Sequence, residues 1–226
     1  MQMQYNKYWP KQSFYIVGSK KPKIRLNYNF KFESLGRNID DKTDWNLALN
    51  NYFKNLNLKY FFLAFEDHFL TNLVNTDIIQ KAESVMLKDE TVGKVRLLPK
   101  YKFCNYLKTY NSDFFYVEEP SSTYLTTSLR PSIWRKDLFM NLLNNNNSTT
   151  PHKFETSNLN INFGMKILIP KTVNPVFPDL DAMRCGKPNN QASKAGKINY
   201  DYYQIELKSE DLKVFRKIKD TWENGI

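Results

Sequence analysis

Two carboxylates and a histidine follow an uninterrupted apolar segment near the middle of the chain. Tyr60 to Phe65 is apolar throughout, and Glu66, Asp67 and His68 come directly after it. A short apolar run rich in aromatic residues is typical of a strand buried on both faces. Charged side chains at the carboxyl end of such a strand lie at the rim where open α/β sheets bind ligands.

Adjacent carboxylates at a rim suit a divalent cation, because Mg²⁺ and Mn²⁺ prefer oxygen ligands. Such a cation would sit on the phosphates of a phosphorylated substrate. The alternative is an ordinary strand whose last acids are solvated. Short motifs are weak signals, so the segment by itself favours neither interpretation.

The composition is that of a globular protein with an excess of positive charge. The 226 residues are enough for one domain with a real core, and the 41% hydrophobic content excludes a disordered chain. The net charge of +10 favours an anionic partner, which is a nucleic acid, an anionic membrane surface or a phosphorylated substrate. Charge alone does not choose among them.

The cysteines and the hydropathy favour a cytoplasmic setting. Cys104 and Cys185 form no C-x-x-C pair, and with two histidines the chain has too few ligands for a Cys/His zinc site. One disulfide between them stays open. There is no apolar run of 18 residues and no apolar signal core in the first ten residues. We therefore expect no membrane span and no export signal, with peripheral contact at the inner membrane surface left open.

The spacing of apolar residues predicts alternating strands and helices. Strands are expected at 13–17, 60–65, 91–98, 114–117, 124–128, 166–169 and 198–207, with a weaker candidate at 24–32. Helices are expected at 44–56, 76–88, 132–143, 153–161 and 209–222. This order predicts an α/β fold in one domain, residues 1–226, with a mostly parallel central sheet flanked by helices.

Several short segments occur in an order that resembles a known family. They are Tyr8-Trp9-Pro10, Asp44-Trp45, the run from Phe65 to Leu70, Val95-Arg96-Leu97, the run from Thr127 to Lys136, and Lys153-Phe154-Glu155. Together they resemble a group of bacterial and viral glycosyltransferases with the GT-A fold, over most of residues 8–155. In that group a strand ends in Asp-Asp or Glu-Asp before an aromatic residue. Segments like Ser-Leu-Gln-x-x-Ile-Trp-Arg and Trp-x-Phe-Glu come later.

The chain departs from the family pattern at three places. Arg130 stands where the pattern has Gln, and His152 stands where it has Trp. The chain also starts at about the end of the first helix of the GT-A fold. The resemblance thus implies a Rossmann-like GT-A domain that lacks the usual first strand and helix and is shortened at its N-terminus.

The resemblance assigns the acidic residues to metal binding and to base catalysis. Asp67 would ligate Mn²⁺ or Mg²⁺ directly, with Glu66 in support, so that the metal neutralises the diphosphate leaving group of a nucleotide sugar. Glu155 would be the catalytic base that accepts the proton of the acceptor hydroxyl. The alternative for Glu155 is a carboxylate at a helix start that serves the macrodipole.

For several other polar and aromatic residues the sequence leaves two alternative roles. Arg96, Arg130 and Arg135 would contact donor phosphates or an anionic acceptor, or else be surface charges. His68 would be a third metal ligand or, as expected more often for a lone histidine, an exposed histidine at the rim. Trp45 and Trp134 lie on apolar stripes, so we expect core residues first and sugar platforms second.

The leading hypothesis is therefore a hexosyltransferase that moves a sugar from a nucleotide-sugar donor to a glycan or lipid-linked acceptor. Its rival is a basic protein that binds single-stranded nucleic acid through aromatic residues between Tyr101 and Tyr116. The lysines are spread along the whole chain, which counts against this rival. A third hypothesis is an inactive transferase remnant that only binds a glycan.

Overall fold

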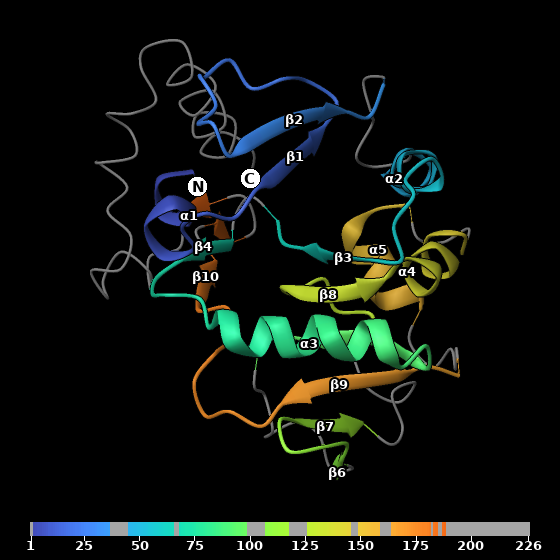
Figure 1. Cartoon of the computed structure of the whole chain (residues 1–226). Helices are drawn as coiled ribbons and strands as arrows, with labels where there is room; N and C mark the ends of the chain where they lie inside the picture. The colour runs from blue at the N-terminus through green and yellow to red at the C-terminus, as the bar shows by residue number, and fades with distance from the viewer. Residues whose placement is uncertain are drawn as a thin grey trace.

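A six-stranded mixed sheet forms the centre of the protein (Figure 1). The computed structural model describes residues 2–36, 45–65, 68–98, 107–117, 126–145, 149–158, 164–181, 183–184 and 187–188. The strand order is β3 (Tyr60–Leu63), β8 (Ser132–Arg135), β5 (Val92–Arg96), β9 (Lys166–Pro170), β7 (Phe114–Val117) and β6 (Leu107–Thr109). Only β5 and β9 are parallel, and every other neighbouring pair is antiparallel.

The expectation of a mostly parallel sheet is therefore wrong. The main reason is β8, which lies between β3 and β5 and runs antiparallel to both. Its residues were expected to begin a helix over 132–143, but the helix α4 begins at Lys136 and ends at Leu143. Ile133 and Trp134 are residues that strands favour, and backbone hydrogen bonds to two neighbouring strands outweigh the helical spacing of the apolar residues that follow.

The other elements pack around this sheet. Besides α4, the described helices are α1 (Gln2–Tyr8), α2 (Trp45–Lys54), α3 (Thr76–Lys88) and α5 (Pro151–Ser157). Three small sheets pair β1 (Phe14–Gly18) with β2 (Phe30–Ser34), β4 (His68–Leu70) with β10 (Asp179–Asp181), and β11 (Met183–Arg184) with β12 (Lys187–Pro188). Among the described helices, none combines the length and the apolar character needed to cross a bilayer.

Local sequence signals place several elements correctly. The helix expected at 76–88 is α3, and its N-terminus is capped by Asn75, whose side chain accepts a hydrogen bond from the amide of Ile78. Strands expected at 13–17, 114–117 and 166–169 are found to within about a residue at each end. The expected elements at 198–207 and 209–222 and both cysteines lie outside the described residues. Of the strand expected at 124–128, residues 126–128 are described and form a turn and irregular backbone, so this prediction is wrong for them.

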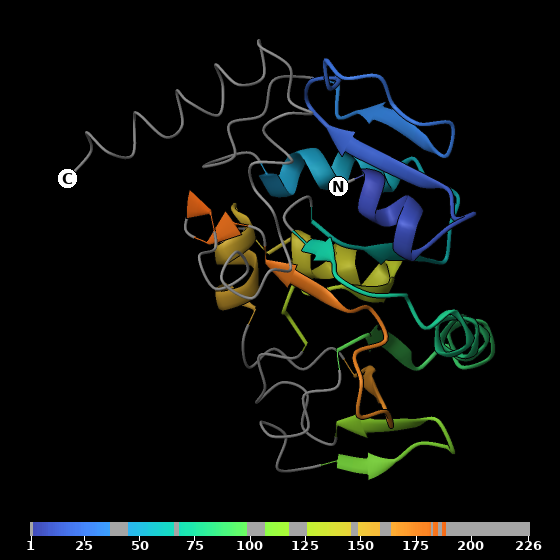
Figure 2. The same ribbon diagram turned by 90° about the vertical axis from the view of Figure 1, so that its left-hand side faces the viewer.

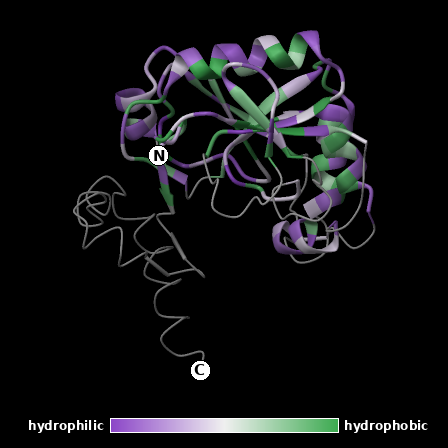
Figure 3. Cartoon of the chain, turned by 90° about the horizontal axis from the view of Figure 1, so that it is seen from below, coloured by the Kyte–Doolittle hydropathy of each residue, from purple (hydrophilic) through white to green (hydrophobic). Residues whose placement is uncertain are grey.

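The sheet separates two hydrophobic cores. Residues from α1, α3 and β1–β2 form one core, and residues from α2, α4 and α5 form the other. Figure 2 shows α3 and α5 on opposite sides of the sheet, and Figure 3 shows hydrophobic strands at the centre. Along β3, Tyr60 and Phe62 reach the first core while Phe61 and Leu63 reach the second. The strand thus contacts both cores as expected, but its edge position leaves all four residues half-buried.

A close approach at Gly93 joins β5 to the second core. The pairing of β5 with β9 shifts register between Val92 and Lys94, so that Gly93 sits at an irregularity in the strand. A Cβ atom at this position would lie 2.6 Å from Leu138 Cδ2 and 2.9 Å from Met165 Cβ. The absence of a side chain lets α4 lie against the central strand.

We predict that Gly93→Ala destabilises the protein by about 1–3 kcal/mol, because the added methyl group overpacks this contact. Urea denaturation gives the free energy of unfolding. Gly18→Ala is the matched control, since Gly18 is also in a strand and its Cβ would meet only Phe32 Cε2, at 3.8 Å. Equal losses in the two variants would contradict the prediction.

Candidate active site at the rim of the sheet

The rim at which β3 and β5 end is the candidate site. Ser132, the first residue of β8, pairs with Leu63 on one side and with Arg96 on the other. The carboxyl ends of two strands and the segment that leads into β8 therefore meet at one edge of the sheet. Residues of three segments that carry the family resemblance gather here.

The Glu66–Asp67 pair lies outside the described residues, but its two neighbours are fixed. The His68 amide donates to the Phe65 carbonyl over 3.1 Å, and the Phe65 amide donates to His68 Nδ1 over 3.2 Å. His68 is only 5% exposed, and its ring packs edge-on against Phe65. The expectation of an exposed rim histidine is therefore wrong, and Nδ1 is engaged by the backbone rather than open to a metal.

The fit of a divalent cation to this rim depends on the Glu66–Asp67 pair. Within the described ranges, no three His, Cys, Asp or Glu side chains gather in a way that could hold a metal ion. Mg²⁺ commonly binds through one or two carboxylates, substrate phosphates and water, so a pair of acids is enough for such a site. The metal ligands stay a prediction from the sequence.

Glu155 is tied directly to the segment that precedes β8. Its Oε1 accepts a hydrogen bond of 2.7 Å from the amide of Leu129. Helix α5 is capped by Thr150 and begins with Pro151, which makes Glu155 the fifth of its seven residues. A carboxylate so far along the helix does not serve the N-terminal end of the macrodipole, so that alternative is wrong.

The segment bearing Leu129 is also hydrogen-bonded to a buried lysine that was not predicted from the sequence. Lys94 is fully buried on β5, and its Nζ donates to the carbonyls of Ser128 and Thr126 over 2.6 and 3.2 Å. The same Nζ lies 3.9 Å from the centre of the Trp134 ring. The available signal was the alternation in Val92-Gly93-Lys94-Val95-Arg96, which puts both basic residues on one face of an otherwise apolar strand.

The surroundings of Lys94 disfavour the protonated form of its amine. Burial, followed by the nearby charge of Arg96, lowers the pKa of Lys94 well below its usual value, while the charge of Glu155 acts in the other direction. The Nζ group finds backbone acceptors in the carbonyls of Ser128 and Thr126. Lys94 thus fixes the backbone at the rim without requiring a buried ion pair.

The three arginines have different surroundings. Arg96 is 3% exposed at the end of β5, and the Arg130 guanidinium lies 3.4 Å from the buried carboxylate of Asp179 on β10. Arg135 donates to the carbonyls of three residues, Val92, Met86 and Asp89. It therefore fastens the end of α3 to β5. Surface charge is the wrong interpretation for Arg96 and Arg135, and only Arg96 and Arg130 belong to the rim.

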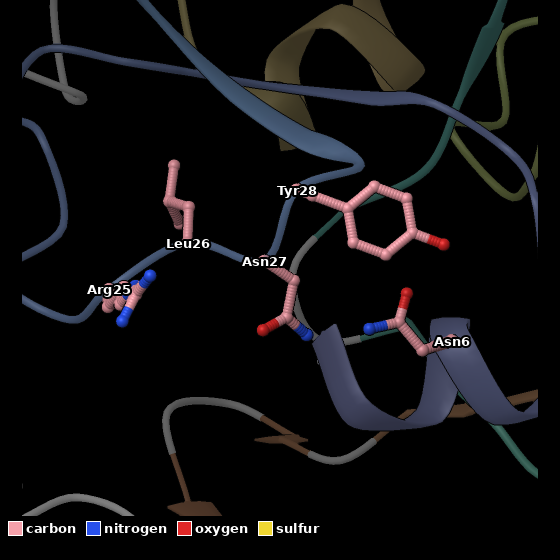
Figure 4. A pocket seen from close by; sticks show the side chains of 5 residues that line it. All are labelled: Asn6, Arg25, Leu26, Asn27 and Tyr28. Carbon is pink, nitrogen blue, oxygen red and sulfur yellow. The ribbon is translucent and has the colours of Figure 1, made fainter.

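Both tryptophans singled out in the sequence are core residues, as expected. Trp134 is fully buried, and Trp45 is 9% exposed and packs edge-on against Phe154. A separate hollow of about 570 Å³ lies elsewhere, between α1 and the segment that joins β1 to β2 (Figure 4). It is lined by Asn6, Arg25, Leu26, Asn27 and Tyr28. Among the described residues, none of those at the rim lines this hollow.

Comparison with known protein families, with curated proteins and with solved structures finds no match to this chain. The glycosyltransferase resemblance therefore stays a prediction. The contact between Glu155 and Leu129 is independent of it, because it is a feature of the fold.

We predict that Lys94 makes stability rise with pH. A basic group whose pKa is lowered by folding binds fewer protons in the folded than in the unfolded state. The free energy of unfolding therefore increases as pH rises from the folded pKa towards the usual value of 10.5, by at most about 1.4 kcal/mol per pH unit.

Lys94→Met tests this prediction, since it keeps an unbranched chain but removes the titrating group. Urea denaturation at several pH values between about 8 and 10 should give a shallower rise for the variant than for the wild type. The variant should also lose about 2–4 kcal/mol, because two buried carbonyls lose their donors. Parallel pH profiles would contradict the role given to Lys94.

Proposed function

We propose that the chain is a metal-dependent glycosyltransferase that transfers a sugar from a nucleotide-sugar donor to a hydroxyl group of a glycan or lipid-linked acceptor. The observation that carries the proposal is the hydrogen bond from the Leu129 amide to Glu155. It joins Leu129 and Glu155, which lie 26 residues apart and belong to the two later segments of the resemblance. The contact lies at the rim where β3 ends, and Glu66 and Asp67 follow β3 in the sequence.

Glu155 is the proposed catalytic base. The acceptor oxygen attacks the anomeric carbon, the bond from that carbon to the diphosphate breaks, and the acceptor proton passes to the Glu155 carboxylate. Its hydrogen bond with Leu129 holds the carboxylate in one orientation, and Lys94 holds the segment that supplies the amide. Such support from surrounding residues is what a catalytic group needs to keep its geometry.

Arg130 is the proposed partner of the diphosphate, and Arg96, which is 3% exposed, is proposed to contribute through its charge. Both lie at the rim, and the Arg130 side chain is about a third exposed, which leaves part of it accessible to a ligand. A guanidinium group suits phosphate oxygens because it offers several donors in a fixed plane. A divalent cation held by Glu66 and Asp67 would neutralise the charge that develops on the leaving diphosphate.

The nucleic-acid alternative has less support. Binding to single strands requires aromatic faces that are open to bases. In the described part of the aromatic segment, Phe114 is fully buried, Phe115 lies under Lys171 Nζ at 4.7 Å, and the Tyr110 hydroxyl donates to Asp89. These rings are engaged within the protein.

We predict that Glu155→Gln lowers the rate of sugar transfer or donor hydrolysis by about 10²–10⁴-fold, because the base is lost. Donor affinity should change little, since the glutamine oxygen still accepts from the Leu129 amide. The rate is measured with Mn²⁺ across uridine and guanosine diphosphate sugars. Glu90→Gln is the control, because the Glu90 side chain is exposed on the surface. Equal rates in the two variants would remove Glu155 from the chemistry.

We predict that Asp67→Ala abolishes the Mn²⁺-dependent part of nucleotide-sugar binding, as measured by titration calorimetry with and without the metal. The reason is that a coordinating carboxylate is removed from a site with few ligands. A wild-type chain that binds no nucleotide sugar in the presence of Mn²⁺ would overturn the proposed function. Binding of a glycan without any turnover would instead identify the inactive remnant.

A further inference from the structure

Although the lysines are spread along the whole chain, its net positive charge is concentrated at the N-terminal end, where acidic residues are missing. Residues 1–32 contain seven Lys and Arg residues and no Asp or Glu, and the first acid is Glu33. This short part of the chain therefore accounts for +7 of the net charge of +10. The remaining 194 residues are close to balanced. Such an asymmetry indicates an anionic partner for this end of the molecule.

The basic side chains gather on the segment that joins β1 to β2. Because these two strands are parallel, the segment must return along the pair before β2 can begin. Lys20, Lys21, Lys23 and Arg25 are all exposed on it. Figure 1 shows β1, β2 and α1 together at one end of the molecule, far from β6 and β7.

Apolar side chains lie exposed among these cations. Ile24, between Lys23 and Arg25, is 42% exposed, and Tyr28 is 91% exposed. Charged side chains alone are enough to keep a protein in solution, so this role does not require exposed apolar side chains. Basic residues interleaved with an aliphatic and an aromatic side chain are typical of surfaces that lie in the boundary between lipid headgroups and acyl chains.

The segment is anchored to α1. The Asn27 amide donates to Gln2 Oε1 over 2.7 Å, and Asn29 Nδ2 donates to Asn6 Oδ1 over the same distance. Asn6 and Asn27, one residue from each contact, also line the hollow between α1 and the segment, together with Arg25 and Tyr28 (Figure 4). The surface is thus built in advance of any partner.

We propose that this basic patch, defined as Lys20, Lys21, Lys23 and Arg25 with Ile24 and Tyr28, docks the protein on a bilayer that contains anionic phospholipids. Each basic residue close to such a surface strengthens binding about fivefold. A nucleic acid would also bind these charges, but it would gain no contact from an exposed isoleucine between two of them. The patch therefore favours a membrane over a nucleic acid. The proposal is independent of the proposed enzymatic activity.

The experiment is co-sedimentation of the full chain with vesicles of phosphatidylcholine containing about 30% phosphatidylglycerol, at about 0.1 M salt. The patch variant replaces Lys20, Lys21, Lys23 and Arg25 by Gln. The control variant makes the same change at four exposed lysines elsewhere, so that the net charge falls equally. These lysines are Lys54, Lys59, Lys88 and Lys153.

The patch variant should lose binding by several hundredfold while the control variant keeps most of it. Ile24→Ser, a second variant that leaves the charge unchanged, should weaken binding to the same vesicles by several-fold, and thermal unfolding checks that each variant folds. Four results would overturn the proposal. They are no wild-type binding to anionic vesicles, equal binding to pure phosphatidylcholine, equal losses in both quadruple variants, or single-stranded RNA binding that requires the patch but not Ile24.

Discussion

The position of β8 between β3 and β5 is the constraint on which both the sheet and the candidate site depend. All four residues of β8 pair with β3, and three of them also pair with β5, so one register decides which chain segments meet at the rim. The last residue of β8, Arg135, reaches the end of α3, and the segment before its first residue meets Lys94 and Glu155. A shift of β8 by one residue would exchange the side chains between the two cores.

Two buried basic side chains hold this arrangement. Burying a basic side chain is unfavourable unless its donors find acceptors, and here the acceptors are backbone carbonyls. Arg135 satisfies three carbonyls around β5 and α3, and Lys94 satisfies two before β8. Nearby, burial disfavours the Asp89 carboxylate, but hydrogen bonds from Thr91 and Tyr110 and the charge of Lys166 outweigh this and lower the pKa of Asp89 to about 2. The contacts of Lys94 restrict the backbone at the rim, and those of Arg135 and Asp89 restrict it at the opposite edge of the sheet.

Local signals in the sequence predict the elements better than their arrangement. The apolar periodicity of α3 depends on neighbours in the sequence and predicts this helix, whereas the direction of β8 depends on two strands far away in the chain. Lys94 was missed because a lysine is rarely buried, and the burial follows from carbonyls more than 30 residues away. In the sequence, Glu155 and the segment before β8 are connected only through the family resemblance. Their contact in the structure depends on how α5 packs.

The central claim is that this rim binds a nucleotide sugar beside Glu155. The most direct measurement is a crystal structure of the chain with a nucleoside diphosphate and Mn²⁺, in which the anomalous signal locates the metal. We expect the metal at Glu66 and Asp67, with the diphosphate against Arg130 and on the same side of the sheet rim as Glu155. A nucleotide bound at the hollow beside Tyr28, or no metal at the acidic pair, would contradict it.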